Sequence, residues 1–267
     1  MNGALFRQTW YFQRIRLAVV CIGLAVWGFV PPLIYAKFGS QFRVMLESGF
    51  IPDQFARFGG GDIFSLPGAM ALVLIHPIAI ILTSVFAVGF STTAVAGERQ
   101  RGTLETLLAR PISRRSLYLT LAVANLGFIA LTIMSLIAGC LAGATYAGVV
   151  NEIDAARLPM LWLNAWLLFS AFAAIGLAAS VSFDRQPPAI GVTLGFMVVM
   201  YFFDVLGSLW PDAEPLQPFS LFHYLKAKAL LTGAGAPADF VLLTTVILAA
   251  AVWALIVFPA RDIAAPS

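Results

Sequence analysis

The sequence has few of the residues on which most catalytic chemistry depends. It contains two histidines, His76 and His223, and two cysteines, Cys21 and Cys140, and charged residues make up only 11% of the chain. A histidine-rich iron site or an H-E-x-x-H zinc motif is therefore excluded, and no G-x-x-x-x-G-K-[ST] loop is present to hold the phosphates of ATP. We expect no catalytic site, no metal site and no cofactor in this chain.

Apolar residues, in contrast, are abundant. They make up 60% of the 267 residues, and the mean hydropathy is +0.90. A soluble domain of this length fills its core with a much lower apolar fraction, so the excess indicates contact with membrane lipid. The net charge of +3 is too small to indicate a nucleic-acid partner. Both cysteines lie inside apolar runs, which is typical of small packing residues rather than of a disulfide.

Long apolar runs predict an all-α membrane protein with one domain, residues 1–267, and six transmembrane helices. The predicted spans are about 17–36, 67–97, 115–148, 158–182, 188–210 and 238–259. Trp10 and Tyr11 mix with Arg7 and Arg14 before the first span, which predicts an interfacial helix over residues 1–15. G-x-x-x-G runs at 139–143 and 191–195 would permit close helix packing, but such runs are common and assign no partner.

The distribution of cations predicts the orientation. Six spans place both termini on one side, and that side then holds ten of the 16 lysines and arginines. These are Arg7, Arg14, Arg16, Arg99, Arg101, Arg110, Arg114, Arg115, Arg185 and Arg261. Because short cytoplasmic segments are rich in lysine and arginine, we expect both termini in the cytoplasm and the chain in the cell membrane.

One cytoplasmic loop, "GERQRGTLETLLARPISRRS" at residues 97–116, is unusually rich in charge. Gly102 interrupts the second span, Thr103 can cap a new helix, and Pro111 disfavours helix at the residue before it. The loop should therefore hold one short helix. Its leucines form a single stripe at helical spacing, Leu104, Leu107 and Leu108. They could rest on the membrane or on the end of the bundle, or they could dock into another protein.

This loop resembles the permeases of the ABC-2 type transporter family, which carry a pattern like E-R-x-x-G-T-L-E-x-L-L-x-x-P-x-S-R. The matching residues are Glu98, Arg99, Gly102, Thr103, Leu104, Glu105, Leu107, Leu108, Pro111, Ser113 and Arg114. The six-span plan, the N-terminal interfacial segment and "PFSLFHYL" at 218–225 are also similar to that family. The resemblance therefore covers most of the chain.

The resemblance implies a coupling helix that seats on a separate ABC ATPase, which would bind ATP and Mg²⁺, and it implies a second permease subunit. The implied coupling residues are Glu98, Arg99, Arg101, Gly102, Thr103, Leu104, Glu105, Leu107, Leu108 and Arg110. The three leucines would form the docking face, although Arg101 and Glu105 could instead pair locally. Export is the expected direction. The alternative is a membrane anchor or assembly factor that holds an ATPase without moving a solute.

Two further places are candidates for a hinge or for the translocation pathway. His76–Pro77 should kink the second span and could act as a hinge or as a static bend. Asp204 lies in the outer part of the fifth span, where a carboxylate is functional or simply solvated at the interface. The segment 211–237 that follows is too polar to span and predicts a short interfacial or re-entrant helix at the outer face.

Overall fold

The structure is a computed structural model that describes residues 1–48, 65–109 and 112–261, and long helices dominate it. The α-helices are α1 (Gly3–Glu47), α3 (Leu66–Ile75), α4 (Pro77–Ser84), α5 (Glu98–Gln100), α6 (Thr103–Leu108), α7 (Arg114–Tyr146), α8 (Leu158–Ser182), α9 (Gln186–Leu209), α10 (Ala227–Thr232) and α11 (Pro237–Ala260). Two π-helices, η1 (Val85–Phe90) and η2 (Thr93–Gly97), follow α4. Short 3-10 helices fill the connections: η3 (Val150–Glu152), η4 (Ala155–Arg157), η5 (Pro211–Phe219) and η6 (Phe222–Tyr224).

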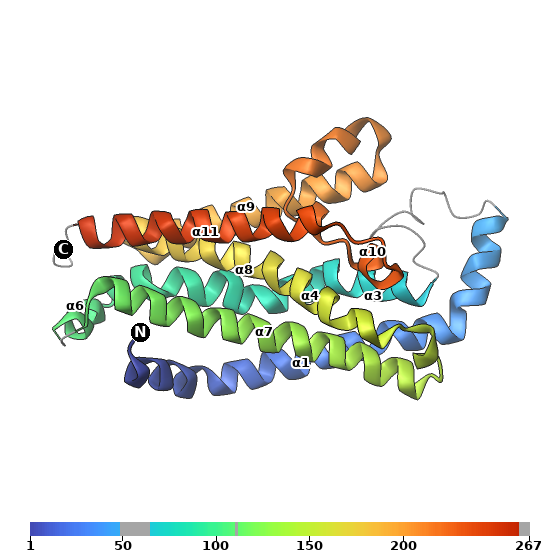
Figure 1. Ribbon diagram of the computed structural model, residues 1–267, viewed down its shortest axis with the longest axis horizontal. Helices are drawn as coiled ribbons and strands as arrows, with labels where there is room; N and C mark the ends of the chain where they lie inside the picture. The colour runs from blue at the N-terminus through green and yellow to red at the C-terminus, as the bar shows by residue number, and fades with distance from the viewer. Residues whose placement is uncertain (49–64, 110–111, 262–267) are drawn as a thin grey trace.

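The long helices run side by side along one axis (Figure 1). The N-terminus, α6 and the C-terminal end of α11 lie at one end of this bundle, which we call the proximal end; α3 and α10 lie toward the opposite, distal end (Figure 1). In the described part of the chain, five helices are long and apolar enough to cross a membrane. A sixth span arises if α3 and the helix beyond His76 are counted as one bent element. The protein is therefore an all-helical, multi-pass membrane protein with five or six candidate spans.

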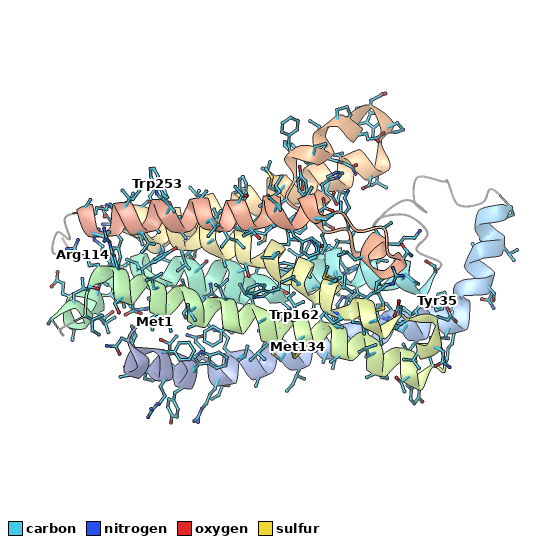
Figure 2. All side chains as sticks on the ribbon, viewed as in Figure 1. Met1, Tyr35, Arg114, Met134, Trp162 and Trp253 are labelled. Atoms are coloured by element: carbon cyan, nitrogen blue, oxygen red, sulfur yellow. The ribbon has the colours of Figure 1, made fainter. Side chains whose placement is uncertain are left out.

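The predicted boundaries of the last four spans agree with α7, α8, α9 and α11 to within two residues. The first span differs more. A separate interfacial helix over 1–15 and a span ending near Lys37 were expected, but α1 is continuous from Gly3 to Glu47 with Pro31 and Pro32 inside it. A proline pair removes two backbone donors and bends a helix without having to end it. Figure 2 shows α1 turning away from the bundle close to Tyr35.

Helices α1 and α7 pack in parallel through small residues. A Cβ atom added to Gly139 would lie 2.1 Å from the carbonyl oxygen of Ala25, and one added to Gly143 would lie 2.3 Å from that of Phe29. On α1, a Cβ added to Gly28 would lie 2.3 Å from the carbonyl oxygen of Leu136. Backbones approach this closely only where no side chain intervenes. The run at 139–143 is therefore used inside the subunit.

Candidate functional site

The segment that the sequence singled out forms a tight turn at the proximal end, between α5 and α6. Gly102 has a φ of 71°, in the left-handed region that favours glycine. Glu98 spans this turn, because its carboxylate accepts hydrogen bonds from the side chains of Arg101 and Thr103. The hydroxyl of Thr103 also donates to the backbone carbonyl of Glu98, at 3.1 Å.

Two local expectations about this turn were wrong. Gly102, not Thr103, occupies the cap position of α6, and no side chain caps that helix. Arg101 pairs with Glu98 rather than with Glu105. Arg101 reaches Glu98 as an i,i+3 neighbour, and the left-handed turn at Gly102 brings Thr103 back toward Glu98. The predicted cap at Ser113 is confirmed, because its side chain accepts a hydrogen bond from the backbone N–H of Ser116.

The leucine stripe faces the bundle more than it faces outward. Leu104 is only 1% exposed and belongs to the main hydrophobic core, and Leu108 packs against that core. Leu107 is half-buried and lines a pocket of about 520 Å³ that it shares with α1 residues such as Phe12 and Arg16. The docking face expected of three leucines cannot include Leu104. Thr103, Glu105, Thr106 and Ala109 are exposed instead, and Arg110 lies outside the described residues.

Ion pairs fasten this turn to the rest of the proximal end. Arg99 lies 2.7 Å from the carboxylate of Asp184, in the α8–α9 connection, and Arg261 at the end of α11 binds the same carboxylate. Arg114 at the start of α7 donates to the backbone carbonyls of Phe258, at 3.2 Å, and Arg261. The four chain segments that meet here are thus held together by arginines.

The segment that precedes this turn in the chain contains π-helices. Between Val85 and Gly97 the chain forms the two π-helices η1 and η2, and such turns are rare and frequently lie at functional sites. The buried hydroxyl of Ser180 on α8 accepts hydrogen bonds from the N–H groups of Val95 and Ala96, at 3.0 and 2.9 Å. It also donates to the carbonyl of Thr92 at 2.8 Å. One serine therefore satisfies three backbone groups of the π-helical segment and binds it to α8.

The second predicted span is broken at His76, as the sequence predicted. The two halves are bent by 45°. The imidazole Nδ1 of His76 accepts the N–H of Ile78 at 3.3 Å and so caps α4. Pro77 has no N–H to offer the carbonyl of Val73, and Trp27 of α1 donates its indole N–H to that carbonyl at 3.3 Å. The Trp27 ring also lies against the His76 ring, with centroids 4.4 Å apart.

Asp204 lies near the distal end of α9 and lines a second pocket, of about 320 Å³, with residues from α3, η5, η6 and α10. Its backbone carbonyl accepts a hydrogen bond from Ser208 within α9 and another from Gln217, and the second bond joins α9 to η5. The expected outer element at 211–237 thus consists of η5, η6 and α10. His76 does not line this pocket, although its neighbour Ile75 does.

Comparison with known proteins decides the family. The sequence profile described as ABC-2 family transporter protein matches residues 33–263 of this chain. The chain belongs to the ABC-2 transporter family. A search of curated proteins found no significant match. The chain is therefore an ABC-2 type permease, a membrane subunit of a kind that is generally non-catalytic and associates with an ABC ATPase.

Sequence reasoning missed two features of this ABC-2 permease. Ser180 carries no local signal, because the backbone groups that it binds are more than 80 residues away in the chain. The role of Trp27 was not predicted. Pro77, which has no N–H, indicates that the carbonyl of Val73, four residues earlier, needs another donor. The second feature could have been anticipated in part, since an indole N–H buried in a bundle needs an acceptor.

Proposed function

We propose that this permease is the membrane subunit of an ABC exporter and that the α5–α6 turn couples it to a separate ATPase. The observation that carries the proposal is the position of that turn. It lies at the proximal end (Figure 1), it follows the π-helices η1 and η2 in the chain, and it contains the family motif. The partner ATPase would bind ATP and Mg²⁺. The resemblance to the family supports export as the direction.

The proximal end would face the cytoplasm. The ten cations assigned to that side by the sequence support this orientation, and Figure 2 places Arg114 at the same end as Met1. Both termini would then be cytoplasmic, in the cell membrane. The ATPase would contact the exposed face of α6, formed by Thr103, Glu105 and Thr106, and the arginines beside it. Leu104 would support that face from behind.

A second permease subunit would pack against α9. Only 22% of the apolar stretch of α9 is buried inside the subunit, the second-lowest share among the candidate spans. Of the described residues, none has an atom within 4 Å of a Cβ added to Gly191 or Gly195. The two glycines of the run at 191–195 are therefore open, and a small-residue face of this kind lets a second helix approach closely.

Co-purification with the cognate ABC ATPase tests the coupling. We expect the double substitution Glu105→Lys/Thr106→Asp to leave folding unchanged, because both side chains are exposed, and to abolish ATPase retention in detergent or nanodiscs. The matched control is Asp212→Lys, an exposed acid on η5 at the distal end, which should retain the ATPase. Substituting Leu104 would not serve, because a charge in the core would unfold the subunit.

Two results would contradict the proposal. If the α6 double variant retains the ATPase as fully as the wild type, the exposed face of α6 is not the contact. If the complex forms but no solute stimulates its ATP hydrolysis, the membrane-anchor alternative replaces the exporter.

A further inference from the structure

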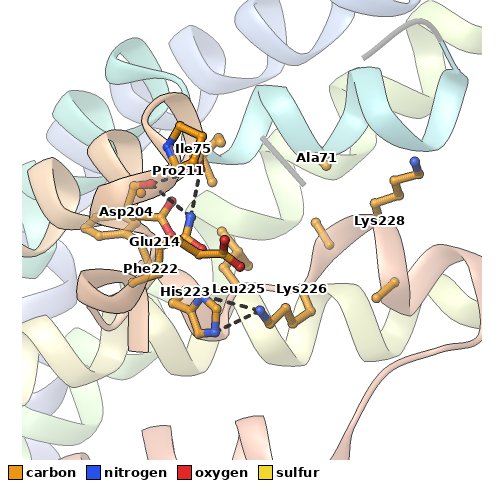
Figure 3. A pocket seen from close by; sticks show the side chains of 15 residues that line it. Ala71, Ile75, Asp204, Pro211, Glu214, Phe222, His223, Leu225, Lys226 and Lys228 are labelled. Atoms are coloured by element: carbon orange, nitrogen blue, oxygen red, sulfur yellow. Dashed lines mark hydrogen bonds between the residues drawn. The ribbon is translucent and has the colours of Figure 1, made fainter. Parts of the chain in front are cut away.

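The distal pocket combines charges of both signs around a single hollow. Its volume is about 320 Å³, and it is lined by the acids Asp204 and Glu214, the lysines Lys226 and Lys228, and His223. Figure 3 shows Asp204, Glu214, His223 and Lys226 close together, from α9, η5 and the η6–α10 segment, while Lys228 lies farther along α10 and points away from them. The volume lies at the lower end of the range of about 300–1,000 Å³ that is usual for small-ligand sites.

These charges do not neutralise one another directly. Among the described residues, the ion pairs shorter than 4.0 Å join Asp184, Glu98 or Asp154 to arginines, and none involves a side chain of this pocket. The ammonium of Lys226 instead contacts the ring nitrogens of His223, at 3.2 and 3.5 Å (Figure 3). The polar contacts found at Asp204 involve its backbone carbonyl, and its carboxyl group lines the hollow.

The electrostatics of the lysine are consistent with an incomplete site. Burial lowers the pKa of Lys226 from its ordinary value, while Asp239 and Asp204 act in the opposite direction. Burial, and then the charge of Lys226, also lower the pKa of His223, against a smaller opposing effect of Asp239. At neutral pH the imidazole is therefore neutral and accepts a hydrogen bond from the ammonium. Desolvated charges of this kind are costly unless a partner satisfies them.

We propose that the distal pocket binds the zwitterionic headgroup of a phospholipid. The ammonium of the headgroup lies against Asp204 and Glu214, and the phosphate lies against Lys226. A purely anionic or purely cationic ligand would satisfy either the lysine or the two acids and leave the other charge uncovered. The dipolar arrangement of the pocket therefore selects a ligand that carries both charges on adjacent groups.

The surroundings favour a lipid over a free solute. The helices α9 and η5, which line the pocket, also expose large apolar side chains: Phe202 is 56% exposed and Phe219 is 72% exposed. Trp210, at the junction of the two helices, is 57% exposed and is of the type that prefers the membrane interface. Acyl chains can therefore follow the apolar surface while the headgroup occupies the pocket. This inference does not depend on coupling to an ATPase.

Lipid binding to the purified permease in maltoside detergent tests the proposal. We expect dioctanoyl-phosphatidylethanolamine to bind measurably more tightly than dioctanoyl-phosphatidylglycerol, which carries the phosphate but no ammonium, in isothermal titration calorimetry or native mass spectrometry. Asp204→Asn and Lys226→Gln should each weaken the first lipid about ten-fold, because each removes one charge-assisted contact. Lys226→Arg should restore binding, which a merely structural role of this lysine would not require.

The controls are Asp212→Asn and Lys37→Gln, which alter exposed charges outside the pocket lining and should change nothing. Free glycerophosphoethanolamine distinguishes the sources of the headgroup. Weaker binding than the lipid supports the lipid assignment, whereas equal binding would overturn it in favour of a soluble zwitterion. Equal affinity for the two lipids, or unchanged affinity in both pocket variants, would overturn the site altogether.

Discussion

The two G-x-x-x-G runs of this permease have the same spacing and opposite surroundings. The run in α7 lies against the backbone of α1, with glycine-to-carbonyl approaches of 2.1 and 2.3 Å for added Cβ atoms, whereas the run in α9 is open. The helices that carry the runs also differ in burial, since half of the apolar stretch of α7 is covered within the subunit against 22% for α9. The motif alone therefore shows that close packing is possible. Burial shows whether the subunit has used it.

The largest expected effect comes from filling the closed run. Gly139→Leu places a side chain where the carbonyl of Ala25 stands, and neither backbone can yield without moving α1 away from α7. We expect a loss of about 3 kcal/mol of stability, and little folded protein. Size-exclusion chromatography and thermal unfolding in detergent measure this. A folded variant with wild-type stability would show that α1 and α7 are not packed through Gly139.

The next effect extends the comparison to two serines of α8, both fully buried. Ser180→Ala removes the acceptor of two backbone N–H groups and the donor to Thr92, so we expect a loss on the order of 3 kcal/mol. Ser170→Ala is the matched control, because the Ser170 hydroxyl has no hydrogen-bond partner in the described part of the chain, and its removal should be nearly neutral. Equal melting temperatures for the two variants would contradict the bridging role of Ser180.

The smallest effect on the subunit itself is expected in the open run. A Cβ added to Gly191 has no atom of the described residues within 4 Å, so the stability of Gly191→Leu should stay within about 0.5 kcal/mol of the wild type. The proposed pairing of subunits should nevertheless weaken, because the added side chain would separate the two helices that the proposal places at this face. Cross-linking and light scattering in nanodiscs would measure the dimer fraction. An unchanged fraction would exclude α9 as the pairing face.

Much of this fold follows from the sequence because hydrophobic length and proline are local signals. The spans from α7 to α11 are bounded by polar or proline-containing turns, and the break at His76 follows from Pro77. The continuity of α1 does not follow, because a proline can bend a helix or end it, and the choice depends on what the helix packs against. The π-helices could not be predicted from the local sequence either, because Ser180, which hydrogen-bonds their backbone groups, lies on a helix that is distant in the chain.

The candidate site was predictable in the same uneven way. The motif located the α5–α6 turn, and Gly102 marked the interruption that makes it. The spacing of Leu104, Leu107 and Leu108 correctly placed them near one face of α6. Spacing does not show, however, whether that face is covered by the same subunit or by another protein. Leu104 packs into its own subunit, so the exposed residues between the leucines become the better candidates for contact with the ATPase.

The break at His76 divides span two into a pair of rods with different neighbours. The distal half, α3, packs against α1 and α10. The π-helical segment of the proximal half is hydrogen-bonded to α8 through Ser180. If the ATPase displaces α6 as proposed, the displacement would therefore reach α8 before it reached α3. The two halves would therefore move as separate bodies that meet at His76, rather than as one rigid helix. Trp27 of α1 holds this break through its hydrogen bond to the carbonyl of Val73.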